Sequence, residues 1–180
     1  GKLLWTYAQI GNVWHVCAGD VTGDRVPEVL STSARGQVHL FDAEGRKLRD
    51  LKPSAYVTWV RVALAGPTGP QILAGGTDEE GTILMGLSAD GQTQWRLKLG
   101  AAPAADIDCA SVAADRPWLA IGLRTGGIKV IEVANGTIIA QATNLKIARG
   151  EVAWLTRGST ESPLLLVTAG RDLKAFRVNP

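Results

Sequence analysis

The sequence has few cysteines, little excess charge and no long apolar run, and each shortage excludes a class of protein. Two cysteines in 180 residues, Cys17 and Cys109, are too few for a disulfide framework, and we expect both to be buried free thiols. Nineteen basic and seventeen acidic residues leave a net charge of +2, which argues against a nucleic-acid-binding surface. No apolar stretch approaches the roughly 20 residues that span a bilayer.

The remaining composition is that of a folded domain. Hydrophobic residues make up 46% of the chain and charged residues 20%, so intrinsic disorder is not expected. A length of 180 residues is enough for one substantial core, and we predict a single domain over residues 1–180. No segment has a sustained helical period, which favours an all-β fold.

A glycine-containing turn recurs along the chain. Its three versions end at Gly45, Gly91 and Gly136, so the spacing is 46 and then 45 residues, and one further step leads past the C-terminus to Gly1. Strand-like runs flank every turn, several with alternating polar and apolar residues. The runs before the turns are 37–41, 82–85, 128–131 and 173–178, and those after them are 47–51, 93–97, 137–140 and 2–5.

Four prolines give a second measure of the same repeat. Each proline opens an apolar run, as proline does at the first residue of a strand. These prolines are Pro27, Pro70, Pro117 and Pro163, and the strand candidates upstream of them are 13–18, 57–64, 107–112 and 152–155. Four strands in each of four repeats predict a β-propeller of four four-stranded blades. The blades predicted are 11–52, 56–99, 104–143, and 147–180 plus 1–7.

The position of residues 1–7 suggests how the ring closes. We expect this segment to supply the outermost strand of the C-terminal blade and so to satisfy its edge. Two arrangements remain open: a monomer that closes as four blades, and a homodimer in which two chains share one ring of eight blades.

Two segments resemble repeats of known propeller families. Residues 41–45 and 1–5 are similar to the repeats of quinoprotein-like (pyrroloquinoline-quinone type) propellers, and Trp5 and Trp95 hold equivalent places after their turn glycines. The segment Asp20-Val21-Thr22-Gly23-Asp24-Arg25-Val26-Pro27-Glu28 resembles the calcium loop of FG-GAP (integrin-type) repeats. That resemblance implies a calcium ion, more structural than catalytic, with these ligands: side-chain oxygens of Asp20, Thr22, Asp24 and Glu28, and the carbonyl of Val26. The alternative is a metal-free loop held by Asx-type hydrogen bonds.

The upstream strand of each repeat is expected to line the central channel. Tryptophan is abundant on these strands, and aromatic platforms there would suit a sugar, a peptide or a planar ligand; the alternative is that the indoles only fill a narrow axis or pack between blades. The predicted ligand-binding residues are Trp14, His15, Trp59, Arg61, Asp108 and Trp154.

No set of residues resembles a nucleophile elbow or a phosphate loop. We therefore predict a non-catalytic module that binds a protein, peptide or glycan, with calcium as the one cofactor implied. The alternatives are a quinoprotein-like oxidoreductase or another propeller enzyme, and a purely structural, excised or designed repeat scaffold. Residues 1–5 have no signal-peptide core, so we expect any targeting segment to be removed or absent. Both resemblances slightly favour a periplasmic or extracellular location.

Overall fold

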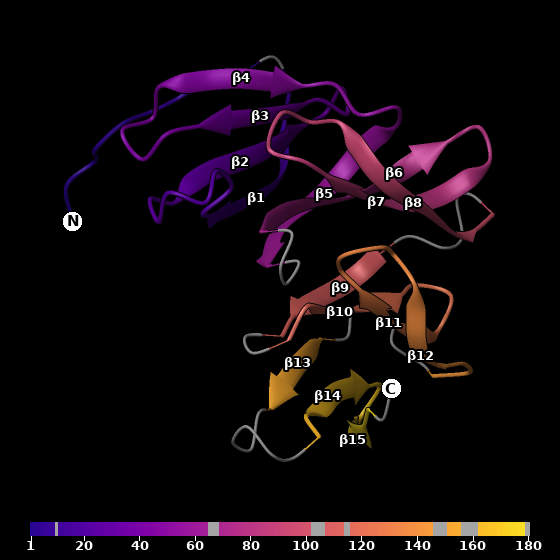
Figure 1. Ribbon diagram of the computed structural model, residues 1–180. Helices are drawn as coiled ribbons and strands as arrows, with labels where there is room; N and C mark the ends of the chain where they lie inside the picture. The colour runs from indigo at the N-terminus through magenta and orange to yellow at the C-terminus, as the bar shows by residue number, and fades with distance from the viewer. Residues whose placement is uncertain are drawn as a thin grey trace.

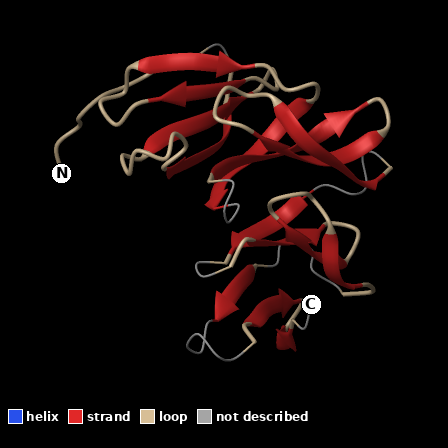
Figure 2. Cartoon of the chain, viewed as in Figure 1, coloured by secondary structure: helices blue, strands red, loops and turns tan. Residues whose placement is uncertain are grey.

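A computed structural model describes residues 1–9, 11–64, 69–101, 107–113, 116–145, 151–155 and 162–178. All regular secondary structure in these residues is β-strand, as Figure 2 shows, which confirms the predicted all-β class. The described part of the chain contains no helix of the length and hydropathy needed to cross a membrane.

The strands form four antiparallel sheets in sequence order, here called blades 1 to 4 (Figure 1). Blade 1 contains β1 (Val13–Gly19), β2 (Glu28–Ser33), β3 (Val38–Phe41) and β4 (Lys47–Leu51). Blade 2 contains β5 (Tyr56–Leu64), β6 (Pro70–Asp78), β7 (Gly81–Leu87) and β8 (Thr93–Gly100). Blade 3 contains β9 (Ile107–Val112), β10 (Trp118–Leu123), β11 (Gly127–Glu132) and β12 (Ile138–Ala142). Blade 4 has three described strands, β13 (Val152–Leu155), β14 (Leu164–Ala169) and β15 (Asp172–Arg177).

The recurring glycine turn joins the third and fourth strands of blades 1 to 3. Gly45, Gly91 and Gly136 have φ values of 81°, 88° and 75°, a region that glycine enters without steric cost. The turn is closed by backbone hydrogen bonds, from Gly45 N to the Asp42 carbonyl at 3.1 Å and from Gly91 N to the Ser88 carbonyl at 2.9 Å. The sequence period therefore marks the hairpin at the outer rim of each of these blades.

Neighbouring blades pack face to face, and each contact is a separate hydrophobic core. The first core, between blades 1 and 2, includes Leu30, Leu40, Ile72 and Met85. The second core, between blades 2 and 3, includes Leu73, Leu84, Leu119 and Ile131. The third core, between blades 3 and 4, includes Ala120, Val130, Leu165 and Val167. All twelve side chains are at most 2% exposed, so the blade-to-blade angles are set by tightly packed interfaces.

The blades follow one another along an open arc (Figure 1). The first strands, β1, β5, β9 and β13, lie on the inner side of the arc, and β4, β8 and β12 lie on its outer rim. The prediction of four blades is confirmed. The predicted closure is not seen, because residues 1–9 form no strand and lie against blade 1, whereas blade 4 lies at the other end of the arc. No core among the described residues joins blades 1 and 4.

Candidate functional site

The inner strands of all four blades contribute to one groove on the concave side of the arc. It has a volume of about 510 Å³. It is lined by His15 of β1, Trp59 and Arg61 of β5, Asp108, Cys109 and Ala110 of β9, and Glu151 and Val152 at β13. The groove exists because the first strand of every repeat faces the axis of the arc, so side chains far apart in the sequence line one space.

A cation supported by two rings lies in this groove. Arg61 donates from Nη1 to Nε2 of His15 at 2.6 Å, and its guanidinium carbon lies 5.5 Å from the centre of the Trp59 ring. Burial, and secondarily the charge of Arg61, lowers the pKa of His15 to about 4. His15 is therefore neutral at physiological pH and can accept the hydrogen bond, which orients the guanidinium over the indole.

Carboxylates lie in the same groove. Oδ2 of Asp108 is buried and, among the described residues, has no hydrogen-bond partner. Glu151, which is exposed, adds a second carboxylate where the chain enters β13. A buried oxygen without a donor is costly unless a ligand or water supplies one. The groove can therefore interact with groups of both charges.

Cys109 and Glu151 are two groove residues that the sequence prediction missed. Cys109 directly follows Asp108, and Glu151 directly precedes the strand predicted at 152–155, so the repeat already places both beside the channel. Cys17 and Cys109 are free and half-buried. Burial, and secondarily the charge of Asp108, raises the pKa of Cys109 to about 11. The thiol is thus protonated at neutral pH and is a weak nucleophile.

The structure brings together four of the six predicted ligand residues, namely His15, Trp59, Arg61 and Asp108. The other two lie elsewhere. Trp14 is 56% exposed at an irregularity in β1 and does not line the groove. Trp154 packs in the third core, where its indole N–H donates to the Ser111 carbonyl at 3.0 Å and its ring lies 6.0 Å from that of Trp118. Trp154 therefore fills space between blades, as the alternative interpretation expected.

Carboxylates of the predicted calcium loop bond to the loop itself. Asp20 accepts hydrogen bonds from Gly23 N at 2.6 Å and Arg25 N at 2.9 Å. Glu28, only 5% exposed, accepts from Val21 N at 2.7 Å. These contacts hold the positive φ of Gly23 and Arg25 and match the Asx-type alternative.

Two further predicted ligands, Asp24 and Thr22, also bond within the loop. Asp24 accepts from Val26 N at 2.8 Å, and Thr22 Oγ1 donates to Oε1 of Glu28 at 3.3 Å. Among the described residues, no group of three or more His, Cys, Asp or Glu side chains is placed to hold a metal ion. The carboxylates of this loop thus bond to the loop itself, and calcium binding stays a prediction.

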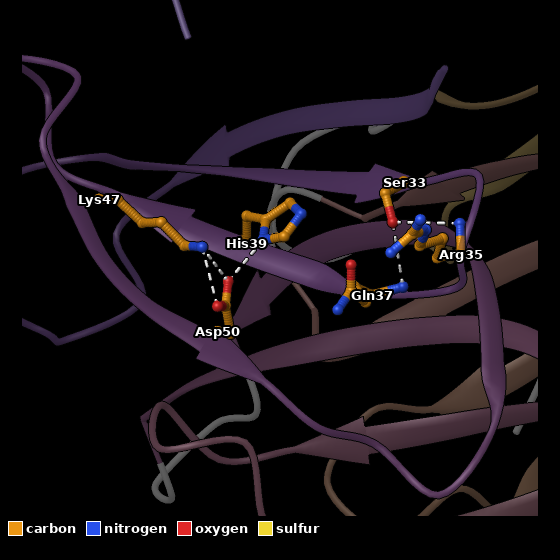
Figure 3. Close-up of polar contacts among 6 residues, drawn as sticks. All are labelled: Ser33, Arg35, Gln37, His39, Lys47 and Asp50. Atoms are coloured by element: carbon orange, nitrogen blue, oxygen red, sulfur yellow. Dashed lines mark hydrogen bonds and ion pairs between the residues drawn. The ribbon is translucent and has the colours of Figure 1, made fainter. Parts of the chain in front are cut away.

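A separate polar cluster lies on the outer half of blade 1 (Figure 3). Nδ1 of His39, a residue 5% exposed, lies 2.5 Å from Asp50 Oδ1, and Lys47 donates to Asp50 Oδ2 at 2.8 Å. The Lys47 hydrogen bond, aided by His39, lowers the pKa of Asp50. In the nearby turn Ser33 Oγ accepts from the backbone N–H groups of residues 35 and 37. None of these residues lines the groove that contains His15.

No family model matches the sequence, and neither does any curated protein. Solved structures do resemble the fold. The computationally designed Ika4 protein is 16% identical with a TM-score of 0.68 over 99% of both chains. BBS1N, in its complex with ARL6DN, is 13% identical with a TM-score of 0.67 over 92% of this chain and 53% of BBS1N.

BamB from Moraxella catarrhalis is 14% identical with a TM-score of 0.59 over 84% of this chain and 43% of BamB. The present chain thus spans about half the length of BBS1N and of BamB. At such low identities the likeness shows the fold alone, and the fold is a propeller-like all-β arrangement.

Proposed function

We propose that this chain is a non-catalytic binding module that takes a peptide segment carrying both a carboxylate and a basic side chain in the inner groove. The observation that carries the proposal is the combination of an Arg61 guanidinium held over Trp59 with the buried, unpartnered oxygen of Asp108 in one groove. The Arg61 guanidinium offers two or more N–H donors to a carboxylate of the peptide. The Asp108 oxygen needs a donor from outside the described residues, which a basic side chain of the peptide would supply.

The chemistry of the groove favours binding over catalysis. His15 is neutral and already accepts from Arg61, and Cys109 is a protonated thiol, so neither is poised as a base or a nucleophile. The complex of BBS1N with ARL6DN adds that a chain of similar fold associates with a protein. A peptide ligand also suits a groove that four separate strands line, because an extended chain reaches across several of them.

The test uses four fluorescent peptides of equal length and apolar content. One carries Asp and Lys, one carries Asp alone, one carries Lys alone, and one carries neither. We expect the wild-type chain to bind the doubly charged peptide most tightly, with roughly a ten- to hundredfold loss of affinity for each charge removed, because a charge-assisted hydrogen bond contributes roughly 1.5–3 kcal/mol.

Two variants, each of which removes one charge from the groove, identify which residue binds which charge of the peptide. In Arg61→Gln the preference for the Asp peptide should disappear while the preference for Lys persists, and Asp108→Asn should show the reverse. Lys129→Gln, which changes a cation on β11 outside the groove, is the matched control and should bind like the wild type. Failure of all four peptides to bind would overturn the proposal and favour a scaffold. So would peptide preferences in Arg61→Gln and Asp108→Asn that do not differ from those of the wild type.

A further inference from the structure

We propose that residues 2–7 of one chain complete blade 4 of a second copy, so that two chains close one ring of eight blades. The proposal is independent of the groove ligand. It rests on where the N-terminal segment lies and on two blade faces that the described residues of the single chain leave largely uncovered.

In this fold the outermost strand of one blade packs on the turn glycine of the next. Leu51 of β4 occupies the position next to Gly91 of blade 2 where a Cβ would otherwise lie. Trp95 of β8 packs in the same way on Gly136 of blade 3. Trp95 also donates its indole N–H to the Val133 carbonyl at 2.7 Å, in the same turn. The contact therefore recurs at the first two blade-to-blade seams.

Trp5 makes this contact at blade 1. Its ring lies in front of Gly45, where a Cβ would clash with it, and its indole N–H donates to the Ala43 carbonyl at 3.2 Å. Tyr7 continues along the same face, with its ring 4.6 Å from that of Phe41. Residues 2–7 thus lie where the outermost strand of a blade preceding blade 1 would lie, yet no strand in the described chain pairs with them.

Blade 4 has the complementary gap. Among the described residues, its β15 is paired only with β14. The matching register places Leu173 and Ala175 of β15 at the positions that Ile128 and Val130 occupy in β11. Ile128 and Val130 are 3% and 2% exposed in the third core, whereas Leu173 is 70% exposed. The face of blade 4 that points away from blade 3 therefore has the apolar residues of a seam without its partner.

Blade 1 is uncovered on its inner half. In β1, Cys17 packs on the first core. Because successive side chains of a strand point to opposite faces, its neighbour Val16 points away from that core, and it is 59% exposed. Trp14, next to it, is 56% exposed. Trp5 and Tyr7 cover only the outer half of this face. A blade docked beside residues 2–7 would bury Val16 and Trp14. Such a blade would explain why two large apolar side chains are exposed on this face of the single chain.

The second copy is favoured over closure within one chain by the packing of the three cores. Bringing blade 4 against blade 1 of the same chain would change the angle at every seam, where fully buried side chains such as Leu40, Leu84 and Val167 interdigitate. A second arc, related by a two-fold axis, fills both open faces without altering any of them. Each chain then donates one strand and receives one.

The first measurement is the molar mass in solution by light scattering during size-exclusion chromatography. We expect about 38 kDa, twice the 19.0 kDa of one chain. A mass of 19.0 kDa across the accessible concentration range would overturn the proposal.

Two variants test the seam itself. Leu3→Pro/Leu4→Pro removes consecutive N–H groups of the donated segment, one of which faces the receiving edge. Leu173→Lys/Ala175→Lys puts charge on the receiving face. Leu3, Leu4 and Leu173 are 78%, 81% and 70% exposed, so the single chain should fold as before, with an unchanged circular dichroism spectrum. We expect each variant alone to halve in mass, to that of one chain.

Mixing the two variants distinguishes exchange between chains from closure within one. A mixed dimer has one seam with an intact donor and an intact receiver, so mixing should restore the doubled mass that neither variant has alone. Closure within one chain predicts no change on mixing, and that result would overturn the proposal. Leu64→Lys, at a position 66% exposed on β5 and away from both faces, is the control and should keep the doubled mass.

Discussion

At the residue scale, His15 should make stability depend on pH. Its pKa in the folded chain is about 4, below the ordinary 6.5, because it is buried beside Arg61. Between these values the unfolded chain binds a proton that the folded chain does not, so the free energy of unfolding falls as pH falls from about 6.5 towards 4. Denaturant titrations over this range should show this loss, and His15→Gln should reduce it.

Arg61 can be tested through the same ring. Nuclear magnetic resonance titration should show His15 with a midpoint near 4 in the wild type and a somewhat higher midpoint in Arg61→Ala, because the variant removes the secondary cause of the low pKa, the charge of Arg61. Arg35→Ala, which removes an exposed arginine in the turn after β2, should leave the His15 midpoint where it is. An unmoved midpoint in Arg61→Ala would show that the two side chains do not contact each other in solution.

The loop of residues 20–28 gives a prediction that separates its two interpretations. Asp20→Ala removes the acceptor for two backbone N–H groups, and we expect about 1–2 kcal/mol less stability with or without calcium. Asp20→Asn keeps one acceptor and should lose less. If calcium instead raises the melting temperature of the wild type and not of Asp20→Ala, the loop binds the ion and the self-bonded interpretation is wrong.

Residue-level sequence patterns predicted the groove only in part. Repeat position identified the inner strands, so His15 and Asp108 were predictable from the order of residues along the chain. The destination of Trp154 was not predictable in this way, because whether a side chain on an inner strand faces the groove or a neighbouring blade depends on the packing between blades. Trp14 differs for a similar reason, since a local irregularity in β1 decides its direction.

At the element scale, the turn glycines have two roles that one pair of substitutions separates. Gly136 and Gly170 both have positive φ, 75° and 65°, but a Cβ at Gly136 would meet the Trp95 indole and one at Gly170 meets nothing. We expect Gly170→Ala to cost about 1 kcal/mol from the backbone alone. Gly136→Ala should cost roughly 1–3 kcal/mol more, because Trp95 must move.

Urea unfolding of the two variants measures that difference. Equal losses would mean that Trp95 does not pack on the turn, and the seam geometry proposed for the dimer would lose its support. The strands themselves were predictable because glycine, proline and alternation are local signals. Their pairing order followed from the hairpin turns, and the third and fourth strands of blades 1 to 3 pair as the spacing predicts.

At the scale of the whole molecule, the angle between blades decides whether four blades make a ring or an arc. No local pattern in the sequence encodes this angle, because it results from the volumes of side chains that meet across each core. The same four repeats are therefore compatible with a closed ring and with half of a larger one. The structure shows the arc, and both of its end faces have large apolar side chains exposed, Val16 and Trp14 on blade 1 and Leu173 on blade 4.

Shared ring closure predicts that thermal stability depends on protein concentration. If a chain completes its last blade only with a partner, the folded dimer is in equilibrium with separate chains, and mass action raises the melting temperature as concentration rises. The Leu3→Pro/Leu4→Pro variant cannot donate its strand, so its melting temperature should be lower and independent of concentration. Calorimetry over a hundredfold dilution series compares the two. A wild-type melting temperature that does not move with dilution, together with the mass of one chain, would mean that the open faces of the arc are stable in water without a second copy.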